Sequence, residues 1–177
     1  KVSVFKGSFF DSVGGDNTIT ATVTNAGRLG VEGDNLTVVG TVNNSGLLDA
    51  DGHALDLTKA VTGSGTATVE NNGTLEFGAA ASTKVTFGAG GDTLVLDTST
   101  STFNKFTGTI SGFDADDHIQ LLAFNSATES VSQKFTSTTS GTVTVSDGVN
   151  HSITLNFVGD YTASAPHNNF VVQDDVN

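Results

Sequence analysis

The sequence contains no cysteine, which excludes disulfide bonds, thiolate metal sites and cysteine nucleophiles. Basic residues are also few: the sequence has seven Lys and Arg and 19 Asp and Glu, which gives a net charge of −12. Binding to nucleic acid or to anionic lipid depends on clustered Lys and Arg, so we expect no nucleic-acid partner. No apolar run is long enough to cross a membrane, and we expect no membrane insertion.

Methionine is absent even at position 1, and no signal peptide precedes the first strand-like segment. We therefore expect a mature, processed or excised piece of a longer protein. What the 177 residues do contain is 27 Thr, 21 Gly and 15 Asp. Gly and Asp are poor helix formers, whereas Thr and Val fit a pleated sheet. The composition predicts an all-β protein with many tight turns.

A seven-residue pattern, V-x-N-x-G-x-L, occurs three times in the first half of the chain, at residues 23–29, 42–48 and 69–75. The spacings are 19 and 27 residues. Between these copies lie short segments in which apolar and polar residues alternate, and Gly, Asn or Asp bounds each one. Repeats of about 20 residues with short strands are typical of a β-solenoid, in which successive turns stack on one another.

The repeats predict a β-solenoid, similar to a parallel β-helix, over residues 1–100. Its Val and Leu side chains would point inward, and its Asn side chains would stack at the corners and bind backbone amides. A β-sandwich is the alternative fold, because it also uses strands that alternate with period two.

Residues 101–177 depart from the repeat and predict a second, β-rich part. Residues 142–146 and 152–157 are expected to form a hairpin closed by Asp147-Gly148-Val149-Asn150. Longer strands and more Phe suggest that this part covers the end of the solenoid. An end that is not covered is an unpaired edge at which subunits could join.

Four stretches carry a resemblance to known proteins: "TVTNAGRLGV", "TVNNSGLLDADG", "GSGTATVENNGTLEFG" and "FTGTISGFDADDHIQL". The run from about residue 21 to residue 124 resembles the β-repeat regions of large secreted surface proteins of alphaproteobacteria. That group includes adhesins and layer-forming proteins exported by type I or autotransporter-like routes. The resemblance implies an extracellular or cell-surface location and a structural or adhesive role without catalysis.

The densest group of carboxylates is Asp114, Asp116 and Asp117, which fall within four residues. Carboxylates this close repel one another unless water or a cation lies between them. Ca²⁺ prefers oxygen ligands, so this loop is a candidate Ca²⁺ site, with backbone carbonyls or a neighbouring turn completing the coordination. A solvated turn is the alternative interpretation.

A second candidate for Ca²⁺ is Asp92, within residues 87–95. This segment is similar to the Ca²⁺-binding nonapeptide of repeats-in-toxin proteins at Gly88, Gly90, Asp92 and Leu94. Phe87 stands where that nonapeptide has its first Gly, and the motif occurs here as a single copy.

No nucleophile elbow, metalloprotease helix or phosphate-binding loop is present, and we expect no enzymatic activity. Asp49, Asp51 and Asp56 could supply a carboxylate pair for sugar hydrolysis, but Asp is common throughout the sequence. The absence of Trp and the single Tyr leave few rings for stacking on sugars.

The sequence therefore predicts a non-enzymatic structural or adhesive subunit of the cell surface. It would assemble with copies of itself into a fibre, layer or biofilm matrix, with Ca²⁺ at its acidic loops and cell-surface polysaccharide as a further partner. The alternative is a monomeric adhesion module that binds a glycan or a protein.

Overall fold

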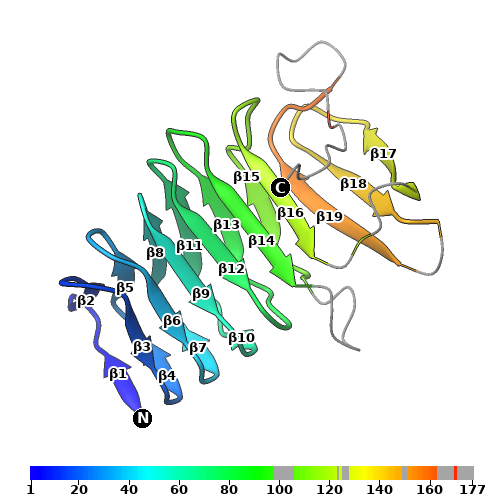
Figure 1. Cartoon of the computed structure of the whole chain (residues 1–177). Coiled ribbons are helices and arrows are strands. Elements are labelled where there is room, and N and C mark those ends of the chain that lie inside the picture. Colours follow the sequence, from blue (N-terminus) through cyan, green and yellow to red (C-terminus); the bar gives the residue numbers. More distant parts are fainter. Residues whose placement is uncertain (98–105, 123, 125–127, 149–150, 163–169, 171–177) are drawn as a thin grey trace.

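The computed structural model describes residues 1–97, 106–122, 124, 128–148, 151–162 and 170. The described residues contain no α-helix, and most strands run parallel to their neighbours. The chain winds repeatedly around three faces, so that successive turns stack along one axis (Figure 1). The protein is therefore an all-β protein built as a β-solenoid, which confirms the predicted fold. The β-sandwich alternative is wrong, because stacked parallel pairs replace the antiparallel pairs of a sandwich.

Each face of the solenoid is one sheet. Sheet A contains β1 (Val2–Val4), β4 (Val23–Asn25), β7 (Val42–Asn44) and β10 (Val61–Thr62), and it continues as single bridges at Ala81 and Phe106. Sheet C contains β3 (Asn17–Ile19), β6 (Leu36–Val38), β9 (Ala54–Leu57), β12 (Thr74–Phe77), β14 (Thr93–Asp97) and β16 (His118–Leu122).

Sheet B is the longest of the three. Its parallel strands are β2 (Phe9–Ser12), β5 (Arg28–Val31), β8 (Leu47–Asp51), β11 (Thr66–Glu70), β13 (Lys84–Phe87) and β15 (Thr109–Ser111). Three further strands extend it, in the spatial order β19 (Ser152–Val158), β18 (Ser140–Ser146) and β17 (Ser130–Phe135).

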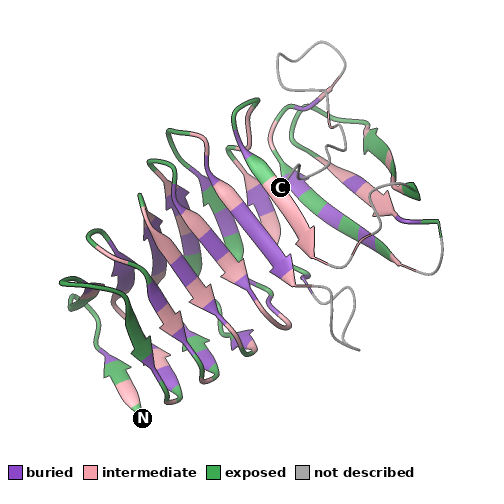
Figure 2. Ribbon diagram, in the orientation of Figure 1, coloured by how far each residue is buried: buried purple, intermediate pink, exposed green. Residues whose placement is uncertain are grey.

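The core consists of inward-facing columns that run along the solenoid axis. In sheet A, Val23 pairs with Val42 and Val42 with Val61, so that one turn takes 19 residues there. In sheet C the fully buried column is Leu36, Leu55, Leu75 and Leu94. Strand residues alternate between this core and the outer surface (Figure 2). Apolar residues at every second position are therefore buried between the turns on either side.

Buried asparagines form the corner between sheets A and B. The side-chain amide of Asn25 donates to Asn44 Oδ1 at 2.9 Å and to the Leu47 carbonyl at 2.8 Å, and its own Oδ1 accepts from the Gly27 amide. Asn44 repeats this arrangement one turn later with the Gly46 amide. The predicted asparagine ladder is confirmed for these two copies of the repeat.

The third copy of the repeat, residues 69–75, lies on a different face. Val69 belongs to β11 and pairs with Phe87 of sheet B, whereas the first two copies begin in sheet A. The next turn places Gly63 beside Asn44, because Val61 of β10 pairs with Val42 of β7 and the register continues by two residues. The 27 residues between the second and third copies therefore correspond to one full turn plus one further face of the solenoid. As a result Asn71, the Asn of the third copy, does not join the ladder formed by Asn25 and Asn44.

The C-terminal strands cover one end of the solenoid. β19 pairs in parallel with β15 and antiparallel with β18, which confirms the predicted hairpin, although residues 149–150 of its loop lie outside the described residues. Phe157 packs at the centre of an aromatic cluster, 1% exposed. The rings around it are Phe113, Phe135, Tyr161 and Phe170. The boundary expected between residues 100 and 101 also lies outside the described residues.

Candidate functional site

The N-terminal end of the solenoid is the most apolar exposed region among the described residues. β1, β2 and β3 are the outermost strands of sheets A, B and C, and no described strand pairs with their far edges. Six large apolar residues are exposed in the described part of the chain, and four of them lie in this first turn: Phe5 at 71%, Phe9 at 73%, Phe10 at 36% and Val13 at 68%.

Exposure of Phe10 follows from its place in the fold. Phe10 pairs with Leu29 in the inward column of sheet B, and Leu29 is fully buried because turns lie on both sides of it. Phe10 has a described turn on one side only. This end of the solenoid therefore exposes apolar side chains that would be buried inside it. It also exposes backbone groups of three strands that have no described partner, and edges of this kind bind other strands.

The first turn is held to the second by backbone hydrogen bonds at its corner. The Ala26 amide donates to the Val4 carbonyl at 2.7 Å, and the Arg28 amide donates to the Ser8 carbonyl at 3.0 Å. Gly27 allows this close approach, since a Cβ there would lie 2.2 Å from the Ser8 carbonyl oxygen. Phe5 and Phe9 therefore project from a loop and a strand that the next turn fixes in place.

The structure brings three of the four predicted metal ligands together, at stacked corners that lead into sheet C. Asp117 accepts the Asp92 amide at 3.0 Å through Oδ1 and the Asp114 amide at 2.8 Å through Oδ2. Asp114 in turn accepts the Asp116 amide at 3.1 Å. The side chain of Asp116 accepts none of these bonds, and the residue is exposed. These carboxylates therefore satisfy backbone amides at two successive turns.

Asp92 is fully buried at this corner. Its Oδ1 accepts the Gly73 amide at 3.2 Å, while its buried Oδ2 has no hydrogen-bond partner among the described residues. Burial raises the pKa of Asp92, against the opposing effect of the amides of Gly73, Asn72 and Gly88. Burial likewise raises the pKa of Asp117. A cation bound beside these groups would lower both pKa values.

The described part of the chain contains no group of three or more His, Asp or Glu side chains placed to hold a metal ion. Ca²⁺ at Asp92, Asp114, Asp116 and Asp117 would thus need backbone carbonyls and water as additional ligands, and it stays a prediction. Gly90 has a structural role, because its φ of +119° and its approach to the Asn72 amide, 2.7 Å from an added Cβ, both require glycine.

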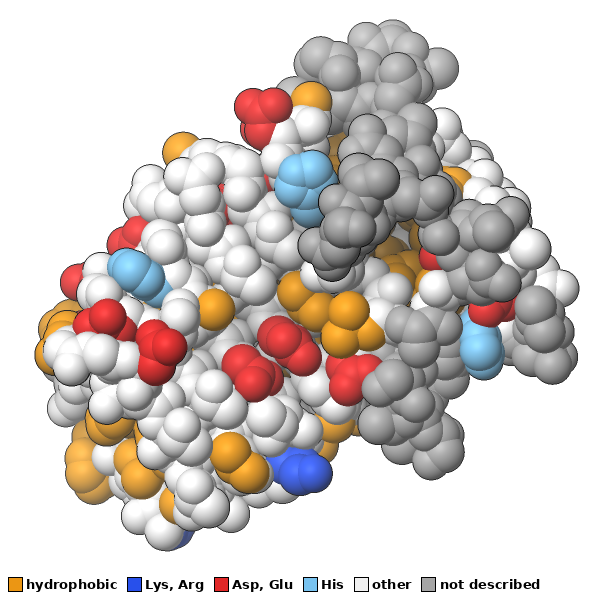
Figure 3. Space-filling view, in the orientation of Figure 1, with side chains coloured by type: hydrophobic (Ala, Val, Ile, Leu, Met, Phe, Trp, Pro, Cys, Tyr) orange, Lys and Arg blue, Asp and Glu red, His pale blue; other side chains and the backbone are white. Residues whose placement is uncertain are grey.

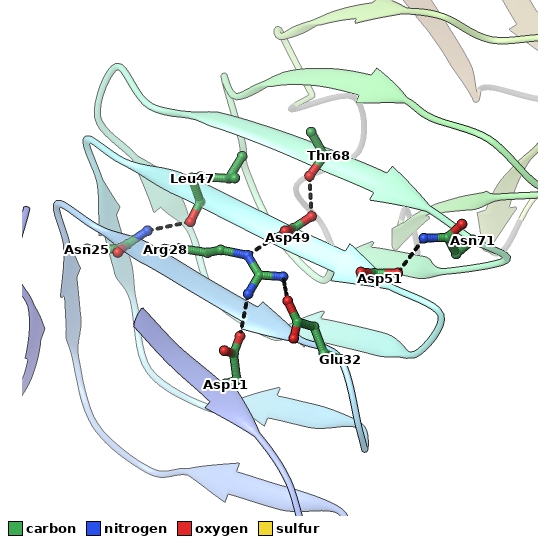
Figure 4. Close-up of polar contacts among 9 residues, drawn as sticks. All are labelled: Asp11, Asn25, Arg28, Glu32, Leu47, Asp49, Asp51, Thr68 and Asn71. Atoms are coloured by element: carbon green, nitrogen blue, oxygen red, sulfur yellow. Dashed lines mark hydrogen bonds and ion pairs between the residues drawn. The ribbon is translucent and has the colours of Figure 1, made fainter. Parts of the chain in front are cut away.

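A second acidic cluster lies on the outer face of sheet B around one arginine (Figure 4). The Arg28 guanidinium contacts Asp11 at 2.8 Å, Glu32 at 2.6 Å and Asp49 at 2.6 Å, and Thr68 donates to Asp49. Although burial disfavours its charged form, the carboxylates raise the pKa of Arg28. Sequence reasoning missed this cluster, since residues that contact each other in it lie up to 21 positions apart in the chain. The 19-residue spacing of the first two repeats is the signal that could have placed them on neighbouring strands.

The three aspartates considered for sugar hydrolysis do not share one surface. Asp49 and Asp51 lie on β8 of sheet B, and Asp49 is bound to Arg28, whereas Asp56 lies on β9 of sheet C. Asp56 is in register with Glu76 on the next strand. Burial raises the pKa of both groups, and the pKa of Glu76 is raised further by Asp56 and Asp97. Figure 3 shows acidic side chains gathered near the middle of this face.

A shallow depression of about 350 Å³ lies on sheet A beside β10 and the bridge residue Ala81. The described residues of its lining are small, and none of them is charged or aromatic: Ala60, Val61, Thr62, Ala80, Ala81, Ser82 and Thr107. Sugar-binding sites generally use aromatic rings and charged or amide side chains. The side chains described in this depression offer hydroxyl groups and methyl groups.

No family model, curated protein or solved structure matches this chain. The described residues also include no helix with the length and apolarity needed to cross a membrane.

Proposed function

We propose that this chain is a non-enzymatic structural or adhesive subunit of a bacterial cell surface, which associates with copies of itself into a fibre, layer or matrix. The observation that carries the proposal is the N-terminal end of the solenoid, where three strand edges and the side chains of Phe5, Phe9, Phe10 and Val13 meet water. The resemblance of residues 21–124 to surface-protein repeats supports an extracellular location.

Association at this end has two physical sources. Unpaired backbone N–H and C=O groups of edge strands gain hydrogen bonds when another strand is added. Exposed apolar side chains gain from burial at about 25 cal/mol per Å² of apolar area removed from water. The two sources act together here because Phe9 and Phe10 lie on β2, an edge strand.

Ca²⁺ is proposed as a partner of assembly. A subunit with a net charge of −12 repels its own copies, and a divalent cation at Asp92, Asp114, Asp116 and Asp117 would reduce that repulsion. The buried and unpartnered Oδ2 of Asp92 supports this site. Cell-surface polysaccharide is proposed as a further partner, with the solenoid as its scaffold.

The test is particle size by light scattering and negative-stain microscopy, first with Ca²⁺ and then with excess chelator. Ordered fibres or sheets that dissolve in chelator are the expected result. Assemblies that survive chelation would keep the structural role and remove Ca²⁺ from it. A monomer of 18.0 kDa under both conditions would overturn self-assembly and favour the monomeric glycan- or protein-binding module.

A matched pair of variants separates the open end from general surface hydrophobicity. Phe5→Ser combined with Phe9→Ser removes the two most exposed rings and is expected to abolish assembly while leaving the fold intact. Val39→Ser removes a 40% exposed apolar residue between β6 and β7, away from the end, and is expected to assemble like the parent chain.

A further inference from the structure

The two outer edges of sheet B point in the same direction. β17 is antiparallel to β18, and β18 is antiparallel to β19, while β19 is parallel to β15 and hence to β2. Two reversals restore the original direction, so β17 runs parallel to β2 at the opposite edge of the nine-stranded sheet. A parallel strand pair can therefore form between β17 of one copy and β2 of another with both copies in the same orientation.

One inward column passes through the whole of sheet B and ends in an aromatic residue at both edges. Its members in order are Phe10, Leu29, Leu48, Ala67, Val85, Ile110, Phe157, Gly141 and Phe135. The ring of Phe135 lies over Gly141, where an added Cβ would be 2.0 Å from it. Continuing the column into a second copy places Phe10 beside Phe135, and aromatic pairs on neighbouring strands stabilise a sheet.

Charge is unevenly distributed between the two ends. The first turn carries Lys1 and Lys6 against Asp11 and Asp16, so its side-chain charges cancel. The described residues from 106 onward carry one basic residue, Lys134, against six acidic ones: Asp114, Asp116, Asp117, Glu129, Asp147 and Asp160. Contact between unlike ends therefore sets a neutral turn against an acidic end, whereas contact between two C-terminal ends would bring like charges together.

From strand direction, register and charge we infer that the occupant of the open end is a second copy of this chain, joined head to tail through β2 on β17. This inference rests on the proposed function and specifies its interface. In the expected register Phe10 lies opposite Phe135, and Ser8 lies opposite Gln133. A head-to-tail contact is heterologous, so it leaves one free edge at each end and propagates into a fibre.

The joint uses a single sheet. Sheet B has nine strands and sheet C has six, so the β3 strand of the second copy would lie about four strand spacings, roughly 19 Å, beyond β16. β2 pairing alone therefore connects the two copies.

The absence of cysteine permits a direct test by cross-linking. Two single variants, Ser8→Cys and Gln133→Cys, are prepared separately and mixed, and a short thiol-specific cross-linker is added. Both positions are exposed, and neither change removes a ring or a charge. The mixture is expected to give a band at twice the 18.0 kDa monomer mass, and each variant alone is expected to give none. The double variant is expected to give a ladder of higher oligomers.

Thr154→Cys mixed with Ser8→Cys serves as the control, since Thr154 is exposed on β19, two strands in from the edge, and should not cross-link. Cross-linking of Ser8→Cys with itself or of Gln133→Cys with itself, in a chain that still assembles, would overturn the head-to-tail joint and leave self-assembly standing. A parent chain that stays monomeric at every concentration and a mixture that gives no cross-link would overturn both.

Discussion

At the corner between sheets A and B, side-chain amides of Asn form the hydrogen bonds that backbone groups form within the strands. A chain that bends sharply leaves N–H and C=O groups without partners, and buried groups of that kind cost about 1–3 kcal/mol each. Asn25 and Asn44 supply both a donor and an acceptor, so each satisfies a backbone amide of its own turn and a carbonyl of the next. The ladder therefore holds successive turns in register.

Replacing Asn44 tests this role. Asn44→Ala removes the acceptor of the Gly46 amide and the donor to the Thr66 carbonyl, and should lower the free energy of unfolding by roughly 2–4 kcal/mol. The measurement is urea denaturation followed by circular dichroism. Asn43→Ala is the matched control, because Asn43 is the exposed neighbour on the same strand and should change stability by no more than about 0.5 kcal/mol. Equal effects of the two changes would contradict the role of the ladder.

Glu76 tests the acidic face of sheet C. Burial, Asp56 and Asp97 all raise its pKa, so its charged form is disfavoured in the folded protein. Glu76→Gln should therefore increase the free energy of unfolding at pH 7. Glu32→Gln, which removes an ion pair with Arg28, should leave it unchanged or lower it by up to about 1 kcal/mol. Thermal denaturation of the two variants in parallel shows whether each change raises or lowers the stability. Destabilisation by Glu76→Gln would contradict the raised pKa of Glu76.

At the scale of strands and turns, the sequence allowed prediction wherever one pattern recurs at one spacing. The 19-residue spacing between residues 23–29 and 42–48 is a full turn, so the strands, the inward Val and the corner Asn could all be predicted. The copy at residues 69–75 could not be assigned to its face from the sequence. The same residue pattern forms a corner between sheets A and B in the first two copies and a corner between sheets B and C in the third. Period-two alternation identifies a strand but does not identify its face.

The acidic residues were found from the sequence, but their hydrogen bonds were not. Asp114 and Asp117 lie together because they share one loop, and Asp92 joins them through a pairing across 25 residues. This separation of 25 residues in the chain is longer than the regular turn of 19, because the chain between these turns includes residues 98–105. The pattern also could not show that the oxygens of Asp117 accept backbone amides. Contacts such as Arg28 with Asp49 depend on register, which follows only once the turns are stacked.

The C-terminal strands should behave as a unit anchored by Phe157. This side chain packs against four aromatic rings and is 1% exposed, so Phe157→Ala should cost roughly 3–5 kcal/mol. We expect amide hydrogen exchange to become faster in β17–β19, with β5–β9 still protected. Phe9→Ala, at a 73% exposed position, should leave exchange in β17–β19 unchanged in the dilute monomer. Loss of protection throughout the chain with Phe157→Ala would contradict this division.

For the whole molecule, the balance of carboxyl groups sets the pH dependence of stability. Burial is the main cause that raises the pKa of six of them: Asp11, Asp56, Glu70, Glu76, Asp92 and Asp117. Each such group holds its proton more tightly in the folded state than in the unfolded chain. The folded state then binds more protons between the two pKa values, and the free energy of unfolding falls as pH rises through that interval.

The expected result is a more stable protein near pH 4.5 than at pH 7, since pH 4.5 lies above the ordinary pKa of 3.8 for Asp and at the ordinary pKa of 4.5 for Glu. Relief of self-repulsion at a net charge of −12 acts in the same direction. The exposed Asp160, whose pKa is lowered by Thr162, acts in the opposite direction. Urea denaturation at a series of pH values gives the slope, and a steady loss of stability on acidification from pH 7 would contradict the effect of burial.

We propose that the two edges of sheet B, β2 and β17, are the surfaces through which copies of this solenoid associate. Amide hydrogen exchange measured by mass spectrometry over a range of protein concentrations tests it most directly. We predict that protection in β2 and β17 rises with concentration while β8 and β11, inside sheet B, stay equally protected throughout. Exchange in β2 and β17 that does not change with concentration would contradict it.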